Sequence, residues 1–223
     1  MIRVAISVEG PTELEFCKKV LVPYLRNYTI EMTPIVVTTS KDRCGRKNSG
    51  GCINKDRVKN EVSKLLYSYD AVTTFYDFYG FSKRDTDSVD ELEEQLYNLI
   101  NNPKFIPYIQ KYEFETLLFS KPEYYEEYFG NSKVTNKMNE IITQFQDIEL
   151  INDSIETSPS KRMEQLFQLN SEKYDKVFHG EGIANDIGME TICKHTKRFN
   201  NWIDILIQLS DNSTKNSTRL IRK

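Results

Sequence analysis

The junction at Glu9 constrains the fold of this chain more than any other segment. An apolar run of strand length, residues 2–8, ends at Glu9, and a glycine and a proline follow at once. A helical pattern then covers residues 12–25, with apolar side chains recurring on one face. A strand that turns directly into a helix is typical of α/β sheets, which carry their sites at the carboxyl ends of the strands. Glu9 stands at such an end.

The alternation of strand and helix continues through the first 110 residues. It predicts further strands at residues 30–38, 71–76 and 105–110, a polar loop at residues 39–51, and helices at residues 54–68 and from residue 88 to just before Pro103. Strands separated by helices predict right-handed crossovers and a parallel sheet. The expected fold class is therefore α/β, with a Rossmann-like, largely parallel sheet flanked by helices.

The second half of the chain shows helical periodicity and no convincing strand. Helices are predicted at residues 113–119, 122–129, 132–146, 160–169, 182–194 and 199–209. We expect an α/β core over residues 1–120, a helical extension packed on it over residues 121–210, and a polar, mobile tail over residues 211–223.

Composition narrows the class of protein. The chain has 223 residues, a formal net charge of −3 and 28% charged residues of mixed sign. No apolar stretch approaches the roughly 20 residues that a bilayer-spanning helix needs. The amino terminus has the pattern of a buried strand instead of a signal peptide. These features predict a cytoplasmic protein with no membrane association, and they leave a homo-oligomer open.

Acidic side chains follow the predicted strands. Glu9 and Asp77 each end an apolar run, and Glu113 and Glu115 follow the run that ends at residue 110. Because parallel strands end at one edge of a sheet, we expect these carboxylates close together, with Glu13 near them in the first helical turn. Such a set suits Mg²⁺ or Mn²⁺. The alternative is a group of polar loop residues and helix caps, with Glu13 stabilising the helix dipole.

Basic side chains gather in two further segments. The loop at residues 41–51 and the helix start at residues 158–162 both suit a phosphodiester substrate. The candidates for phosphate binding are Arg43, Arg46, Lys47, Arg162 and Lys176, and Lys161 is a candidate catalytic cation. Tyr76, Tyr79 and Phe81 could stack on a base beside Asp77. A solvated charge run and an ordinary capped helix are the alternatives.

Five motifs in order resemble those of a bacterial family with a TOPRIM-like fold, similar to the TOPRIM domain of OLD-type nucleases. They are VEGPTE at residues 8–13, FYDFYG at 75–80, YEFETLLF at 112–119, SPSKR at 158–162 and FNNW at 199–202. The resemblance implies Mg²⁺ or Mn²⁺ bound by the acids after the first and third strands. It also implies an ABC/SMC-like ATPase partner in anti-phage defence or abortive-infection modules.

The resemblance also assigns positions within the site. Glu9 matches the first acid, and Asp77 matches the first position of an Asp-x-Asp element. Tyr79 stands at the second acidic position, so one ligand is lost, and Glu113 or Glu115 could replace it.

Together these observations predict a metal-dependent nuclease that cleaves DNA or RNA, as the effector subunit of an ATPase-coupled defence system. The expected catalytic residues are Glu9, Asp77, Glu113 and Lys161, and the expected metal ligands are Glu9, Glu13, Asp77, Glu113 and Glu115. The main alternative is a non-catalytic TOPRIM-like regulatory or sensor subunit that binds a partner ATPase. A phosphatase or phosphotransferase acting on a small molecule is a third.

Overall fold

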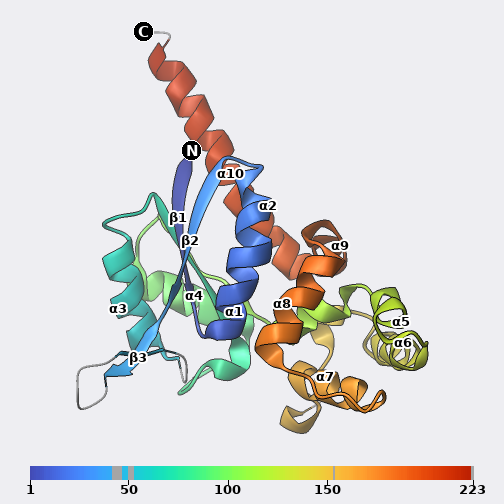
Figure 1. Ribbon diagram of the computed structural model, residues 1–223. Coiled ribbons are helices and arrows are strands. Elements are labelled where there is room, and N and C mark those ends of the chain that lie inside the picture. The colour runs from blue at the N-terminus through green and yellow to red at the C-terminus, as the bar shows by residue number, and fades with distance from the viewer. Residues whose placement is uncertain (42–46, 50–52, 153, 222–223) are drawn as a thin grey trace.

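The computed structural model describes the backbone of residues 1–41, 47–49, 53–152 and 154–221, and the side chains of residues 1–37, 53–152, 154 and 156–210. A parallel sheet lies between two groups of helices (Figure 1). Its strands are β1 (Ile2–Val8), β2 (Ile30–Val36), β5 (Ala71–Asp77), β6 (Phe105–Ile106) and β7 (Ile109–Gln110). The order is β2-β1-β5-β6, with β7 also pairing with β5. The predicted α/β class is confirmed.

The two central strands agree with the sequence prediction closely, and the last predicted strand does not. β1 has the predicted bounds, and β5 includes one residue more than predicted, Asp77. The run at residues 105–110 forms two short strands, β6 and β7, on either side of Pro107 and Tyr108. Proline has no backbone N–H to donate to a neighbouring strand, which explains the interruption.

Helices cover both faces of the sheet. On one side, α1 (Pro11–Phe16), the π-helix η1 (Cys17–Leu21) and α2 (Val22–Arg26) form the continuous run predicted as one helix. On the other side lie α3 (Lys55–Leu65) and α4 (Val89–Ile100) (Figure 1). The two faces alternate along β1: Val4 and Ile6 join the first core, and Ala5 joins the second. This period of two is that of a strand buried on both faces.

The second half of the chain is helical, as predicted. Its elements are the 3₁₀-helix η3 (Phe114–Ser120), α5 (Glu123–Phe129), α6 (Lys133–Phe145), η4 (Ile148–Leu150), η5 (Ile155–Thr157), α7 (Pro159–Gln168), α8 (Lys176–Ile187), α9 (Met189–His195) and α10 (Lys197–Ile221). The single helix predicted at residues 182–194 is wrong, because α8 and α9 are separated by Gly188, which has a φ of +82°. α8 begins at Lys176 because Asp175 accepts hydrogen bonds from two backbone amides of its first turn.

Two further differences concern the ends of elements. Within the predicted polar loop, β3 (Thr38–Lys41) and β4 (Lys47–Ser49) pair as an antiparallel hairpin. α10 continues past residue 211, the expected start of the tail, to Ile221, and this last part extends away from the sheet (Figure 1). Among the described residues, no helix combines the length and apolarity needed to cross a membrane.

An aromatic core attaches α10 to the sheet. The Trp202 ring stacks on Tyr108 and on Phe75, with ring centroids 4.3 Å and 5.7 Å apart. Its indole nitrogen donates a 2.9 Å hydrogen bond to the Thr73 hydroxyl in the middle of β5. The same buried cluster continues into the second half of the chain through Phe114. α10 therefore packs directly against β5, the strand that ends at Asp77.

Candidate functional site

The acids Glu9 and Asp77 leave neighbouring strands at the same edge of the sheet. β1 and β5 run parallel with Val8 opposite Phe75, so the two acids follow this pair by one and two residues. A backbone hydrogen bond from Asp77 reaches the Glu9 carboxylate. A Cβ atom at Gly80 would lie 2.1 Å from Glu9 Oε2. Gly80, in the 3₁₀ turn η2 (Phe78–Gly80), therefore leaves the space that the Glu9 side chain fills.

Asp77 is the most perturbed carboxyl group of this edge. Its Oδ1 atom is buried and, among the described residues, has no hydrogen-bond partner. Burial raises its pKa well above the usual range, and neighbouring carboxylates raise it further; in order of effect they are Glu13, Glu115, Glu9 and Glu113. Five carboxyl groups from three chain segments thus act on one another here. We call Glu9, Glu13, Asp77, Glu113 and Glu115 the acidic cluster.

Two members of the acidic cluster have pKa values near neutrality. Burial raises the pKa of Glu9 to about 7, and the charge of Glu13 adds to the effect. Burial also raises the pKa of Glu115 to about 7, against the lowering effect of Lys176. Both groups can therefore exchange a proton near physiological pH.

The other two members also hold helix starts. Glu13 Oε2 accepts a 2.9 Å hydrogen bond from the Gly10 amide, so Glu13 caps the start of α1 from its first turn, the position where a helix-dipole role was the alternative. Burial nevertheless raises the pKa of Glu13. Glu113 Oε2 accepts a 2.8 Å hydrogen bond from the Ser160 amide in the first turn of α7. This contact joins the motif at residues 112–119 to the motif at residues 158–162.

Lys176 brings a positive charge to the acidic cluster from the first residue of α8. Its Nζ lies 3.4 Å from Glu115 Oε1, an ion pair whose carboxylate is almost fully buried. Burial works against the charged ammonium, but the carboxylates of Glu115, Glu113 and Asp77 outweigh it and raise the pKa of Lys176. Lys176 is therefore charged at neutral pH.

The structure places the remaining predicted cations elsewhere or outside its described part. Lys161 pairs at 2.7 Å with Glu164 on the exposed face of α7. Arg162 is buried, donates from Nε to the Thr157 carbonyl at 2.8 Å, and lies over the Phe145 ring. Arg43 and Arg46 fall outside the described residues, and Lys47 lies in β4 with its side chain outside them. Among the predicted cations whose side chains are described, Lys176 is the one that lies at the acidic cluster.

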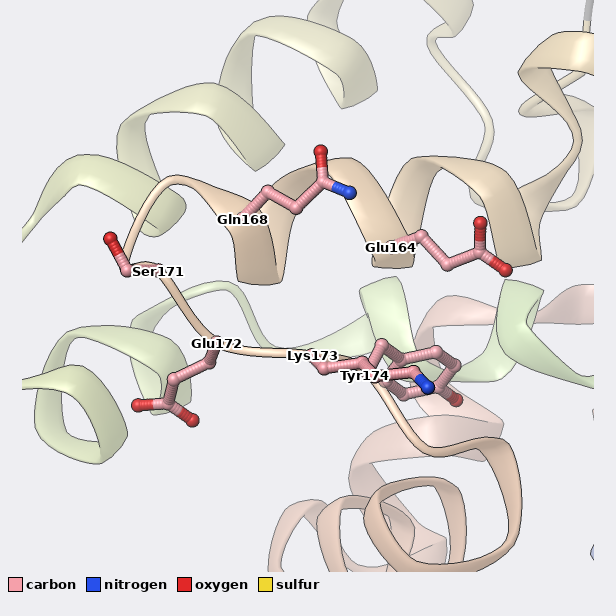
Figure 2. Close-up of a pocket in the computed structure, with 6 residues that line it drawn as sticks. All are labelled: Glu164, Gln168, Ser171, Glu172, Lys173 and Tyr174. Carbon is pink, nitrogen blue, oxygen red and sulfur yellow. The ribbon is translucent and has the colours of Figure 1, made fainter.

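A pocket of about 500 Å³ lies along α7 and the segment that connects it to α8 (Figure 2). It is lined by Glu164, Gln168, Ser171, Glu172, Lys173 and Tyr174, none of which belongs to the acidic cluster. These side chains are spread along α7 and the segment after it and do not converge on one point (Figure 2). The pocket therefore offers no second constellation of reactive groups.

The donor chemistry of the acidic cluster fits a hard divalent cation. Its oxygens are carboxylates, and the buried Asp77 Oδ1 lacks a hydrogen-bond donor among the described residues. In that same part of the chain, no three His, Cys, Asp or Glu side chains are already arranged to hold a metal ion. Binding would therefore require the carboxylates to turn toward a common point.

Sequence reasoning missed three residues beside the cluster. Asn152 donates a hydrogen bond to the Tyr79 hydroxyl, at the position where the resemblance expects a second acid. Tyr112, directly before Glu113, has a left-handed backbone with a φ of +64°. Gly80 leaves the space for the Glu9 carboxylate. The FYG sequence after Asp77 is a signal for such a close approach, because glycine alone lacks a Cβ.

Comparison with known proteins identifies the family. Residues 8–207 match the model of a family described as a domain of unknown function, DUF4276. The chain belongs to the DUF4276 family. This DUF4276 chain is also similar to a solved structure described as the C-terminal region of the Burkholderia pseudomallei OLD protein. Identity is 14%, the alignment covers 94% of this chain and 99% of that chain, and the TM-score is 0.43. No curated protein matches it.

Proposed function

We propose that this DUF4276 protein is a metal-dependent nuclease whose active site is the acidic cluster. The observation that supports this most strongly is the burial of mutually repelling carboxylates around Asp77 Oδ1. Ionised carboxylates packed this way destabilise a fold unless a cation neutralises them. Lys176 supplies one positive charge among five acids, so a divalent cation would remove much of the remaining repulsion.

Glu9, Asp77 and Glu115 are the proposed principal ligands of Mg²⁺ or Mn²⁺. Glu13 and Glu113 each use one oxygen for a backbone amide and keep the other available. A bound cation would supply Lewis acidity toward a scissile phosphate. Glu9 is a ligand in this arrangement, and its alternative role is that of a general base that accepts a proton from the attacking water. The Lys176 ammonium is placed to neutralise charge on a phosphate oxygen beside Glu115.

The nucleic-acid substrate and the partner are proposed from the resemblance to TOPRIM-like proteins. The five motifs converge on the site: Glu9, Asp77 and Glu113 lie in it, Ser160 bonds to Glu113, and Trp202 supports β5. This convergence favours the resemblance over a chance match of short segments. We extend it to a DNA or RNA substrate, an ABC/SMC-like ATPase partner and a role in anti-phage defence.

A cleavage assay tests this proposal. Purified protein, alone and with the ATPase of its module, is incubated with single-stranded DNA, duplex DNA and structured RNA in Mg²⁺, Mn²⁺ or EDTA. We expect metal-dependent cleavage that falls at least 100-fold in Glu9→Gln and Asp77→Asn. Glu140→Gln, an exposed acid paired with Lys137 on α6, is the matched control. Equal cleavage by all variants, or none while Mn²⁺ binding is measured, would contradict the proposal.

Tyr79 favours a second candidate function, a regulatory subunit without catalysis. Its hydroxyl receives a hydrogen bond from Asn152 where a second metal-binding acid would stand. The chain would then dock on the ATPase and sense a signal through the same fold. Under this alternative, Glu9→Gln and Asp77→Asn leave both complex formation and the ATPase rate unchanged, which size-exclusion chromatography and phosphate release would measure.

A further inference from the structure

Two tyrosines stand side by side next to the acidic cluster, and each lies on a segment that carries one of its acids. Tyr79 follows Asp77 by two residues, and Tyr112 directly precedes Glu113. The Tyr79 amide donates a 3.1 Å hydrogen bond to the Tyr112 carbonyl. The two ring centroids lie 5.6 Å apart at an angle of 44°. The acids and the aromatic pair are therefore fixed to each other through the backbone.

Both rings keep part of their surface exposed, unlike the other aromatics of this region. Tyr76 is fully buried and donates its hydroxyl to Ser7, and Phe81 is buried in the core. These two residues, predicted to stack on a base, are thus core residues, because they occupy inward positions of β5 and of the turn after it. Tyr79 and Tyr112 are each only partly buried. Within the described part of the chain, these two rings offer exposed aromatic faces beside the cluster.

A cation flanks each end of the aromatic pair. The Lys111 ammonium lies 5.7 Å from the centroid of the Tyr112 ring. The Arg84 guanidinium lies 4.1 Å from the centroid of the Phe78 ring and donates to the Phe78 carbonyl. The Phe78 ring in turn lies 6.3 Å from that of Tyr79. Lys111 therefore lies against one ring of the pair, and Arg84 lies on the other side, separated from Tyr79 by the buried Phe78 ring.

Tyr112 holds its position in a backbone conformation that costs energy. Its φ of +64° lies in the left-handed region, which a bulky residue rarely occupies. Asn or Gly would adopt this conformation at lower cost. Such strain accumulates where a side chain must point in a particular direction for function. Here it presents an aromatic ring one residue from an acid of the cluster.

We propose that Tyr79 and Tyr112 form a stacking site for an unpaired base of single-stranded nucleic acid, with Arg84 and Lys111 contacting the flanking phosphates. This inference rests on the proposed nuclease function and specifies its substrate class. Aromatic rings between cations match a strand in which bases and phosphates alternate. A duplex keeps its bases stacked on each other and offers these rings no exposed base face.

The test measures binding in EDTA, where no cleavage occurs, so its outcome is independent of the nuclease assay. Fluorescence anisotropy follows a labelled single strand, an abasic strand of equal length and the corresponding duplex. We expect the wild type to prefer the single strand. Tyr112→Leu should weaken that binding by about 5- to 100-fold and leave abasic-strand binding unchanged. Tyr112→Phe keeps the ring and should bind like the wild type.

Two further variants separate stacking from charge and from general damage. Lys111→Ala should weaken single and abasic strands alike and reduce the slope of log K against log salt by about 0.7. Tyr67→Leu, a 92% exposed tyrosine outside the site, is the matched control and should change nothing. Thermal unfolding checks that each variant is folded. The inference is overturned if Tyr112→Leu weakens base-containing and abasic strands equally, or weakens neither, or if the duplex binds as tightly as the single strand.

Discussion

Replacing Glu9 by its neutral isostere should stabilise the metal-free protein, although Glu9 is a proposed active-site residue. Burial and Glu13 raise its pKa from 4.5 to about 7. A carboxyl group whose pKa is raised on folding stabilises the fold at low pH. This contribution is fully present below pH 4.5 and is lost as the pH rises through about 7. At pH 8 the folded protein therefore carries an unfavourable buried charge that the unfolded chain does not.

The size of the effect follows from the two pKa values. A difference of about 2.5 pH units corresponds to at most about 3 kcal/mol, and partial solvent exposure of Glu9 reduces this to about 2 kcal/mol. Glu9→Gln keeps the side-chain shape and the oxygen that accepts the Asp77 backbone hydrogen bond. For a chain of this size, the melting temperature in EDTA at pH 8 should rise by about 4–8 °C. At pH 5, just above the unfolded pKa of 4.5, the gain should fall to about a quarter of its value at pH 8.

Circular dichroism melts at pH 5 and pH 8 in EDTA provide the measurement. Glu115→Gln is the informative comparison, because Glu115 also has a pKa of about 7 but pairs with Lys176. The Glu115→Gln change leaves Lys176 without this carboxylate partner. The gain in melting temperature at pH 8 should therefore be smaller than in Glu9→Gln. An equal gain at both pH values, or a loss of stability at pH 8 in Glu9→Gln, would refute the reasoning.

Three further predictions follow from the same contacts. Mn²⁺ should raise the melting temperature of the wild type more at pH 8 than at pH 5, and Asp77→Asn should remove most of this rise; a rise independent of pH would argue against binding at the acidic cluster. Gly80→Ala should displace Glu9, costing about 1–3 kcal/mol of stability in urea unfolding and lowering nuclease activity as Glu9→Gln does, since the new Cβ would lie 2.1 Å from Glu9 Oε2. Trp202→Ala should cost about 3–5 kcal/mol in the same unfolding experiment, because it removes a fully packed ring and its hydrogen bond to Thr73; a loss below about 1 kcal/mol would show that α10 contributes little.

The parts of the fold that followed from the sequence are those with strong local signals. β1 and β5 are buried on both faces, and an acid and a turn follow each apolar run. The apolar run and the turn residues therefore predict the same strand ends. The start of α8 was not predicted, because Val177 and Phe178 are exposed while Gly180 and Gly182 interrupt the helical pattern. Close packing favours glycine at this position, since a Cβ at Gly180 would lie 3.0 Å from the Phe114 ring.

The candidate site divides in the same way. Glu9 and Asp77 could be placed together because strand parallelism alone brings them to one edge. The sequence could not show which of Lys161 and Lys176 lies at the acidic cluster, because one has a local partner and the other a distant one. Lys161 finds Glu164 three residues along its own helix, whereas Lys176 meets Glu115 from a segment 61 residues away in sequence. Long-range pairing of this sort depends on how α8 packs against η3, and no local pattern encodes it.

The position of Trp202 has a consequence for how the protein is made. β5 carries Asp77, but the ring that packs beneath it and bonds to Thr73 is synthesised more than a hundred residues later. All five carboxylates of the acidic cluster are therefore synthesised well before Trp202 of α10, which packs against β5. The core against β5 is therefore complete only once α10 has been synthesised, so a fragment released before residue 202 lacks the ring that packs on Phe75 and bonds to Thr73.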